Sequence, residues 1–321
     1  MSAASQKHAP AMLVVLAFAI VYLVWGSTYL FIRIAIQSIP ALVMAGMRFF
    51  SAGLLLLVWC AIRGERLISP ALIRPAIVSG LLLLFFGNGA VVWAEQFLPS
   101  SFVAVLTAAS PIWVVILDQR NRAANFSHKA TLAGLVLGFT GVIMLFSEHV
   151  SGALHNSEGN RAQLGAMGIL VVGAACWAGG SLYSKYRLQG ISHSVATAWQ
   201  MLTGGAAFFL VGGISGEWSQ FHPQQVSVQS WLSLLYLISF GSLAGYSAYT
   251  WLLQVRPATQ VSTHAYVNPV VAVLLGIALA GETLTGWQWG GLAVILLSVL
   301  LVNLARYRKQ SSNITRAKSL A

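Results

Sequence analysis

The chain is poor in charged residues. Only 8% of its 321 residues are Asp, Glu, Lys or Arg, whereas soluble domains carry about a quarter. Hydrophobic residues make up 57%, which is too large a share for a soluble protein of this length. Long acidic, Gln/Asn-rich and Pro-rich tracts are also missing, which excludes a disordered or fibrous domain. This shortage of charge places the chain among the polytopic membrane proteins.

Cysteine and the usual catalytic motifs are scarce too. The two cysteines, Cys60 and Cys176, fall inside apolar stretches, which argues against a disulfide framework or a metal site. The sequence contains no HExxH stretch and no Walker-type GxxxxGK[ST] stretch. Its seven acidic residues lie mostly at the ends of apolar stretches, so they form no catalytic cluster. We therefore expect no catalytic residues, no metal and no cofactor.

The 18 Lys and Arg residues outnumber the acidic residues, but they do not form a nucleic-acid-binding face. They lie at the ends of apolar stretches and in the tail, without interleaved aromatic residues, so we expect no nucleic-acid partner. No small-residue cleavage site follows the first apolar stretch, Met12 to Ile32. We expect that stretch to be a retained span and not a signal peptide.

Apolar stretches of about bilayer length recur along the chain and predict an all-α polytopic membrane protein with ten transmembrane helices. The predicted spans are 11–32, 41–62, 75–94, 100–117, 129–147, 164–184, 194–214, 231–252, 259–280 and 286–304. With Lys7 on one side, fifteen Lys and Arg residues share that side, only Arg33 and Arg161 lie on the other, and Arg48 lies within a span. The positive-inside rule then predicts that both termini are cytoplasmic.

The two halves of the chain carry similar residues in the same order. At a spacing of 152 residues Trp25 matches Trp177, and at 158 residues Gly87 matches Gly245. The other matches are Gly53 with Gly205, Gly64-Glu65 with Gly216-Glu217, Trp93 with Trp251, Gln96 with Gln254, Pro99 with Pro257, and Pro111 with Pro269. Each copy holds five spans, an odd number, so the second copy enters the membrane from the opposite side. Inverted repeats of this kind favour a site near the midplane and alternating access.

The predicted organisation follows from these repeats. It comprises a cytoplasmic segment (1–10), a first repeat (11–147), a periplasmic linker (148–163), a second repeat (164–304) and a basic cytoplasmic tail (305–321).

Several segments carry a resemblance to a known family. "WGSTYLFIR", "AGMRFF", "GNGAVVWAEQ" and "AYVNPVVAVLLG" followed by "GETLT" resemble the EamA-type exporters of the drug/metabolite transporter superfamily. The resemblance covers roughly 11–305 and is nearest to the YedA-like branch, with YddG-type aromatic amino-acid exporters more distant. It implies an inner-membrane exporter with spans 1–4 and 6–9 around a central pathway. Family members commonly carry Gly-Glu after span 4 as well as span 9; here only Gly281-Glu282 is present.

Polar and aromatic side chains recur on single faces of the predicted spans. Tyr22, Trp25 and Tyr29 share one face of span 1, because residues three, four and seven apart align on a helix. Polar stripes inside an apolar bundle face a water-filled cavity or one another. The predicted substrate-pathway residues are Tyr22, Trp25, Tyr29, Arg48, Asn88, Trp93, Trp177, Ser181, Tyr246, Tyr249, His264 and Asn268. Pro111 and Pro269 are predicted hinges, since proline inside a helix kinks its axis.

Some of these residues have alternative interpretations. Hydroxyl side chains also hold helices together without touching substrate. Arg48 can form a structural bridge with Glu95, carry a pathway charge, or extend its charged end to the outer headgroups. His264 can couple protons, or it can be a neutral histidine bonded to a neighbouring hydroxyl. The small-residue motifs Gly134-x3-Gly138 and Gly286-x3-Gly290 indicate either a homodimer through spans 5 and 10 or internal packing.

The predicted function is therefore a secondary active transporter of the inner membrane. Its expected partners are the lipid bilayer and a small-molecule substrate such as an amino acid or an amphipathic or aromatic compound. The alternatives are a channel or facilitator, which needs rings of like side chains, and a membrane-embedded enzyme, which needs converging acids or histidines.

Overall fold

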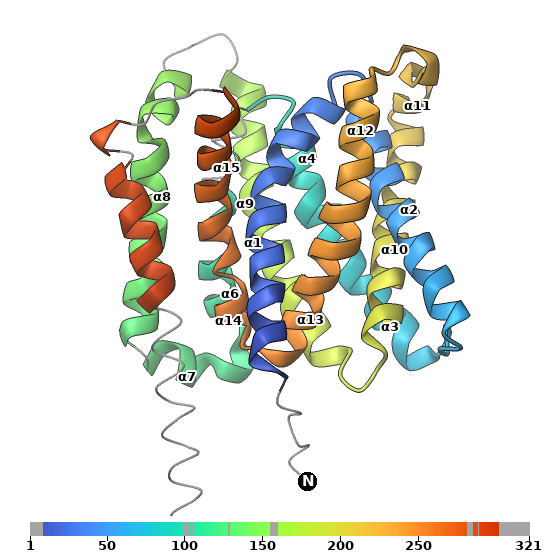
Figure 1. Cartoon of the computed structure of the whole chain (residues 1–321), viewed down its shortest axis with the longest axis horizontal. Coiled ribbons are helices and arrows are strands. Elements are labelled where there is room, and N and C mark those ends of the chain that lie inside the picture. Colours follow the sequence, from blue (N-terminus) through green and yellow to red (C-terminus); the bar gives the residue numbers. More distant parts are fainter. Residues whose placement is uncertain are drawn as a thin grey trace, which may run out of the picture.

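The computed structural model of the chain consists of helices joined by turns and loops. It describes residues 9–98, 103, 106–127, 129–154, 160–280, 285–287 and 289–301, and within these ranges it contains no strand. The all-α class is therefore confirmed. The long helices run alternately up and down one bundle (Figure 1). We call the face where α1 begins the lower face and the face where α1 ends the upper face. Gly281-Glu282 and the basic tail lie outside the described residues.

The first half of the chain supplies the helices before residue 155. They are α1 (Ala11–Ala35), α2 (Ala41–Ile62), α3 (Pro70–Gly80), η1 (Leu81–Asn88), α4 (Gly89–Ala94), α6 (Ser110–Leu117), η2 (Gln119–Asn121), α7 (Arg122–Ser127) and α8 (Lys129–Leu154). Pro40 precedes α2 and Pro70 lies in the first turn of α3. Proline suits both positions, because the first turn of a helix leaves its N–H groups unbonded in any case.

The second half repeats this order. Its helices are α9 (Asn160–Arg187), α10 (His193–Ile214), α11 (Glu217–Gln220), η4 (Pro223–Gln225), α12 (Val228–Tyr236), η5 (Leu237–Tyr246), α13 (Ser247–Val255), α14 (Ala258–Val261) and α15 (His264–Ala280), and residues 289–301 are also helical. Ser192 and Ser227 cap α10 and α12, since each side chain accepts a bond from a backbone N–H in the first turn.

Six helical segments are long and apolar enough to cross a membrane. They are Ala11–Ala35, Ala41–Ile62, Pro70–Ala94, Ala162–Arg187, His193–Ile214 and Val228–Val255. Two shorter apolar helices are Leu132–Met144 and Trp289–Leu301. Leucines such as Leu16, Leu55 and Leu210 are exposed on the outside of these helices, as hydrocarbon contact requires. The chain thus crosses the membrane repeatedly, and the count of ten spans stays a prediction.

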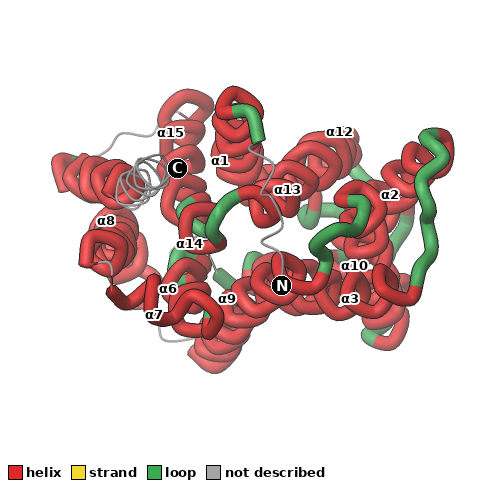
Figure 2. The backbone as a smooth tube through the Cα atoms, turned by 90° about the horizontal axis from the view of Figure 1, so that it is seen from below, coloured by secondary structure: helices red, strands yellow, loops and turns green. Residues whose placement is uncertain are grey.

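The two halves meet most closely where α2 packs against α10, at one end of the bundle (Figure 2). Gly53 and Gly205, matched in the sequence, both lie in this contact. A Cβ atom on Gly53 would be 2.7 Å from the backbone nitrogen of Leu202, and one on Gly205 would overlap the backbone of Phe50. Both positions therefore need glycine, because larger residues would push the two helices apart.

A second matched pair holds the ends of these helices. Gly64 follows α2 with φ +70° and Gly216 follows α10 with φ +79°, the left-handed conformation that ends helices at glycine. The glutamate after each glycine then bonds the start of the other helix. Glu217 accepts a 2.8 Å bond from the backbone N–H of Leu42 in α2, and Glu65 accepts one from Ser192 at the start of α10. The same device thus operates on opposite faces of the bundle.

Two segments are wound as π-helix, which the sequence analysis did not predict. They are η1 in the third span and η5 in the eighth, and the spacing of 158 residues places 81–88 on 239–246. π-helical turns are rare, and they occur frequently at functional sites. They also interrupt the 3.6-residue periodicity, so Ser239 is only half-buried and bonds the carbonyl of Leu235, while Ser242 and Tyr246 are buried.

Candidate functional site

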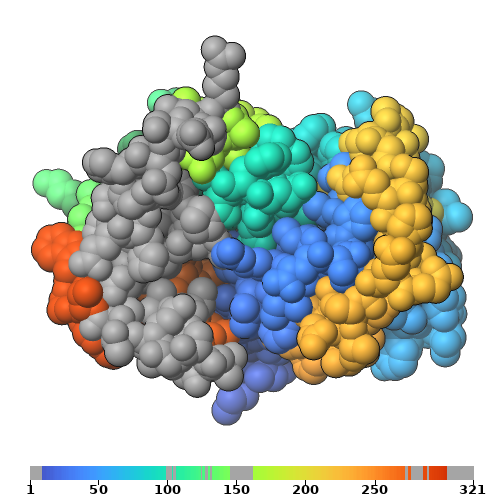
Figure 3. Space-filling view, turned by 90° about the horizontal axis from the view of Figure 1, so that it is seen from above, coloured from blue at the N-terminus to red at the C-terminus, as the bar shows by residue number. Residues whose placement is uncertain are grey.

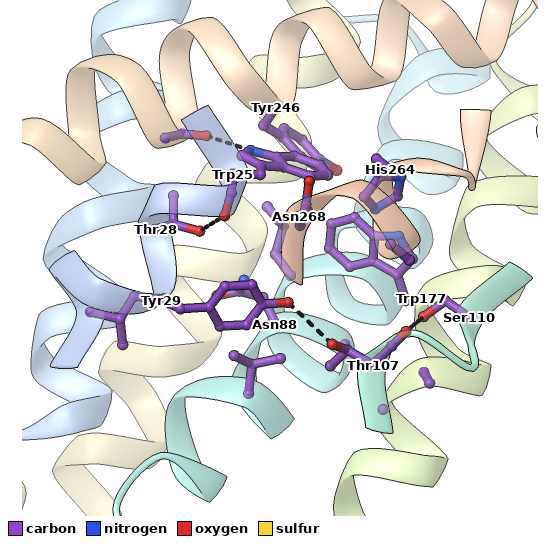
Figure 4. Close-up of a pocket in the computed structure, with 18 of the residues that line it drawn as sticks. Trp25, Thr28, Tyr29, Asn88, Thr107, Ser110, Trp177, Tyr246, His264 and Asn268 are labelled. Carbon is purple, nitrogen blue, oxygen red and sulfur yellow. Dashed lines mark hydrogen bonds between the residues drawn. The ribbon is translucent and has the colours of Figure 1, made fainter. Parts of the chain in front are cut away.

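A pocket lies between the two halves of the chain, with about 770 Å³ of space between its lining atoms, part of which is open to solvent. Its walls come from α1, α2, η1, the residues around 107–110, α9, η5 and α15 (Figure 4). The lining combines aromatic rings with a few polar groups, which suits an amphipathic ligand.

Eight of the twelve predicted pathway residues line this cavity. They are Trp25, Tyr29, Arg48, Asn88, Trp177, Tyr246, His264 and Asn268. Tyr22, Ser181 and Tyr249 lie outside the lining but bond residues beside it. Trp93 is directed elsewhere: its ring packs 4.7 Å from that of Phe97, in a cluster with Ala90 and Leu170.

Aromatic rings close the lower end of the cavity. Trp25 and Trp177 meet edge to face with centroids 5.5 Å apart, and Tyr249 lies 4.9 Å from Trp25 and 5.3 Å from Trp177. His264 completes the group at 5.1 Å from both Trp25 and Tyr249. We call these four residues the aromatic floor. Edge-to-face and tilted ring contacts of this kind stabilise one fixed arrangement of the four side chains.

Hydrogen bonds fix the rings of the aromatic floor. The indole N–H of Trp25 donates to the carbonyl of Gly241 over 3.0 Å, and that of Trp177 donates to the Tyr249 hydroxyl over 3.0 Å. Ser181 bonds the same hydroxyl over 2.6 Å. The carbonyl of Gly241 belongs to η5, so the π-helical winding supplies one of the groups that hold the floor.

Each tryptophan of the floor packs against a π-helical glycine of the other half. A Cβ atom on Gly245 of η5 would lie 2.5 Å from Nε1 of Trp25, and one on Gly87 of η1 would lie 3.1 Å from Cε3 of Trp177. Gly87 and Gly245 occupy equivalent positions of the two repeats, as Trp25 and Trp177 do. This crossed arrangement connects the halves directly beneath the cavity.

Arg48 is buried at the wall of the cavity without a charged partner among the described residues. It is 3% exposed; its Nε donates to the Ser242 hydroxyl over 3.0 Å and its guanidinium lies 4.6 Å from the Phe49 ring centre. Its Nη1 has no hydrogen-bond partner. Arg48 therefore does not extend to the headgroups, and that interpretation is wrong.

The expected bridge between Arg48 and Glu95 is not formed in this conformation. Both carboxylate oxygens of Glu95 are buried without a hydrogen-bond partner, as is Nη1 of Arg48. Two residues of η5 contact the guanidinium of Arg48 instead. Ser242 accepts a bond from Nε, and a Cβ atom added to Gly241 would lie 3.0 Å from Nη2. The guanidinium is thus held toward the cavity.

Gln200, the repeat mate of Arg48, has its amide fully bonded. Its Nε2 donates to Ser79 over 2.7 Å and to Ser184 over 3.0 Å, and its Oε1 accepts from Tyr246 over 3.0 Å. The contrast with Arg48 is informative, because buried polar groups are normally satisfied. Three buried polar atoms without a hydrogen-bond partner belong to residues of the cavity lining: Nη1 of Arg48 and the side-chain oxygens of Asn88 and Asn268.

His264 bonds a backbone carbonyl and not the neighbouring hydroxyl expected from the sequence. Its Nδ1 lies 3.0 Å from the carbonyl oxygen of Val261. Because a carbonyl oxygen only accepts, Nδ1 carries a proton, and the ring is fixed within the aromatic floor.

The predicted hinge prolines occupy different positions. Pro269 lies inside α15, as expected, whereas Pro111 lies in the first turn of α6, which begins at Ser110. Helical residues 106–107 and a turn at 108–109 come directly before α6, so the chain is bent at this proline, and the carbonyl of Thr107 accepts a bond from the Ser110 hydroxyl; the hinge role of both prolines stays a prediction. The first glycine motif is also placed: Gly138 packs within the chain against Tyr266 and Ser298.

Several cavity residues were missed by the sequence analysis. Thr28, Gly241 and Ala174 line the cavity, and Gly173 lies beside Ala174. Thr28 follows Trp25 by three residues, so the helical face that identified Trp25 also contained it. Gly173, Ala174 and Gly241 have no polar side chain, so a pattern of polar residues could not identify them. Because they are small, they leave space that belongs to the cavity.

Below the aromatic floor, two polar bonds join the two halves at the lower face, and Lys185 adds bonds within the second half. The Tyr22 hydroxyl bonds Thr263 over 2.8 Å, and Tyr186 donates to Asp118 over 2.7 Å. Lys185 donates to the carbonyl of Leu253 and, over 2.7 Å, to that of Arg256. The cavity is thus separated from the lower face by two successive layers.

Comparison with known proteins identifies the family. The EamA-like transporter family matches residues 12–147 and 164–304, one segment in each half. The chain belongs to the EamA-like transporter family. It is 39% identical over 290 residues, 89% of each chain, to a protein of Escherichia coli K12 named "Uncharacterized inner membrane transporter YedA". This EamA-family chain is accordingly a multi-pass protein of the inner membrane.

More distant relatives share the same extent. The chain is 26% identical over 310 residues to an Escherichia coli K12 protein named "Probable amino-acid metabolite efflux pump", covering 90% of this chain and 95% of that one. One solved crystal structure superposes with a TM-score of 0.72 at 18% identity, covering 93% of this chain and all of that one. That likeness shows the fold alone. The names of these two relatives describe one as an inner membrane transporter and the other as an efflux pump.

Proposed function

We propose that the protein is a secondary active transporter that exports a small amphipathic metabolite across the inner membrane by alternating access. The observation that carries the proposal is the aromatic floor. Trp25 and Trp177 come from equivalent positions of two repeats and meet beneath one central cavity. In an inverted-repeat carrier the site lies between the repeats, and one side is closed at a time.

The proposed orientation puts the lower face in the cytoplasm, with both termini there and ten spans in two inverted repeats. The excess of Lys and Arg in the lower connections supports it. The crossed bonds of Glu65 and Glu217, at opposite faces, support the inverted arrangement. In this orientation the aromatic floor and the bonds of Tyr22, Tyr186 and Lys185 close the cytoplasmic side.

The cavity suggests which substrate it takes. A donor on Arg48 Nη1 has no partner, and acceptors on Asn88 and Asn268 are likewise unpaired. A substrate with an anionic group beside a hydrogen-bond donor, and an apolar part against the rings, would satisfy all three. A zwitterionic amino acid or a similar amphipathic metabolite fits this description. The printed name of the amino-acid metabolite efflux pump, a relative, agrees with this class.

Counterflow in proteoliposomes tests this function. Liposomes loaded with an unlabelled candidate amino acid should accumulate the labelled compound transiently, because a carrier exchanges the two. A channel or facilitator would let the label equilibrate without an overshoot, and a membrane enzyme would change it chemically. Equal equilibration for every amino acid and amphipathic compound tried, with no overshoot, would contradict the proposal.

A homodimer through spans 5 and 10 belongs to the proposal as well. Gly138 packs inside the chain, and a Cβ atom on Gly290 would lie 3.7 Å from Met144 of α8, whereas one on Gly286 would have no atom of the described residues within 4 Å. The contact would therefore use the Gly286 end of the last helix. Light scattering of the detergent-purified protein should give twice the mass of one chain, and Gly286→Leu should lower it; the mass of one chain for the unmodified protein would contradict the dimer.

A further inference from the structure

Lys185 fastens the lower face of the second repeat. It lies near the end of α9, and its ammonium donates to the carbonyls of Leu253 and Arg256, where α13 ends. α9 packs against α13 at this contact. Carbonyls at the end of a helix attract a cation, because they carry the negative end of the helix dipole. The bond therefore ties spans 6 and 8 together below the cavity.

The first repeat has the same parts at the opposite face. At the spacing of 152 residues that relates Trp25 to Trp177, Lys185 is equivalent to Arg33. At the spacing of 158 residues that relates Gly87 to Gly245, Leu253 and Arg256 are equivalent to Glu95 and Leu98. A basic residue at the end of span 1 thus corresponds to Lys185, and the end of span 3 corresponds to its acceptors.

In this conformation the upper contact is not made. Arg33 is exposed, and within the described part of the chain no hydrogen bond or ion pair joins it to Glu95. Glu95 is 8% exposed as a residue, and both of its carboxylate oxygens are buried without a partner. The charges of Arg33 and Arg48 nevertheless act on it. The end of α1 and the end of span 3 adjoin on the upper face (Figure 3).

A buried carboxylate without a partner is costly and needs an explanation. We propose that Arg33 and Glu95 form a latch that closes the upper face when the carrier changes conformation. This inference rests on the proposed alternating access, in which each inverted repeat adopts the conformation of the other. Arg33 then reaches the end of span 3 as Lys185 now reaches the end of span 8. Glu95 adds a charge that Leu253 lacks, so the upper latch is an ion pair.

The two latches hold opposite conformations, so weakening them has opposite effects. The reporter is Ala174→Cys at the cavity wall, in a chain with Cys60→Ala and Cys176→Ala, labelled by an impermeant thiol reagent from the upper side. Arg33→Gln should raise the labelling rate several-fold, because the upper face closes less often. Lys185→Gln should lower it several-fold, and Arg33→Lys should stay near the parent rate.

Cross-linking tests the contact itself. Arg33→Cys with Glu95→Cys should form a disulfide under mild oxidant, faster in the Lys185→Gln background, and the bond should stop Ala174→Cys labelling until it is reduced. The control pair Ile34→Cys with Glu95→Cys should link poorly, since neighbouring helical residues point about 100° apart.

Neither measurement needs a substrate, so the latch and the export function fail separately. Arg33→Gln labelling that is unchanged or falls, or equal cross-linking by the control pair, would overturn the latch. A failed counterflow experiment with both latch results positive would overturn only the export function.

Discussion

The indole rings of Trp25 and Trp177 lie 5.5 Å apart at 76°, although the residues are separated by 152 positions in the chain. Each ring packs on a π-helical glycine of the opposite half, so the pair joins the two repeats at the point where the cavity ends. Neither ring can move far without the other. A transporter that opens on the lower side must therefore separate these two rings.

The first prediction concerns the rings themselves. Trp25→Phe keeps an aromatic ring but removes the N–H that bonds Gly241, at a cost of about 1 kcal/mol. Trp25→Ala and Trp177→Ala also remove the edge-to-face contact, worth roughly another 0.5–1.5 kcal/mol. We expect transport to fall slightly in Trp25→Phe and strongly in both alanine variants, while folded protein stays in the membrane. Wild-type counterflow by both alanine variants would contradict a role for the floor.

The second prediction uses the two π-helical glycines as a matched pair. An added Cβ atom at 245 would lie 2.5 Å from Trp25, whereas at 87 it would lie 3.1 Å from Trp177. Gly245→Ala must displace Trp25, and such overpacking costs about 1–3 kcal/mol. Gly87→Ala should cost distinctly less. Melting in detergent and tryptophan fluorescence measure this; a larger loss for Gly87→Ala would show that the rings are not seated as described.

Much of the site could be predicted from the sequence because it follows the helical period. Trp25, Tyr29, Asn268 and His264 were identified from spacing, and the internal repeat paired Trp25 with Trp177 across the chain. Arg48 was identified as the basic residue inside a span. These assignments depend only on one face of a helix being polar, which a sequence displays directly.

The remaining features depend on departures from the regular helix. The π-helical winding of η5 brings Ser242 and the Gly241 carbonyl to Arg48 and Trp25, and no 3.6-residue pattern shows it. Trp93 was predicted because it lies near Asn88 and Glu95 in the sequence, but its ring packs on Phe97. The sequence also paired Glu95 with Arg48. In the repeat, however, Glu95 corresponds to Leu253, whose carbonyl accepts a bond from Lys185.

The third prediction concerns sidedness. Ser219 lies exposed on the upper face in α11, and Gln189 lies exposed on the lower face between α9 and α10. In a cysteine-free chain, Ser219→Cys should react with an impermeant reagent in intact cells, and Gln189→Cys should react only after the membrane is opened. The fifteen-to-two distribution of Lys and Arg is the reason. The reverse labelling pattern would place the aromatic floor on the periplasmic side.

The fourth prediction separates a structural from a substrate-binding role for Arg48. Glu95, the partner proposed from the sequence, does not bond Arg48, so Arg48→Gln should not leave a broken ion pair. Losing the bond to Ser242 costs about 1 kcal/mol, while removing an unpaired buried charge offsets that loss. We expect a melting temperature close to that of the parent. Binding of an anionic substrate should nevertheless weaken roughly 10- to 100-fold, as loss of a charged hydrogen bond implies.

The matched variants for Arg48 are Arg48→Lys, which keeps the charge, and the double variant Arg48→Gln with Glu95→Gln. Since the two side chains are not bonded here, their effects on melting should add, whereas a bridge would give a coupling of roughly 0.5–3 kcal/mol. Arg48→Lys should recover part of the affinity but not all, because an ammonium cannot reproduce the two-pronged guanidinium contact with a carboxylate. Affinity by equilibrium binding and melting by fluorescence are measured on the same preparations. Strong destabilisation of Arg48→Gln with unchanged affinity would assign Arg48 to the fold and remove it from the substrate site.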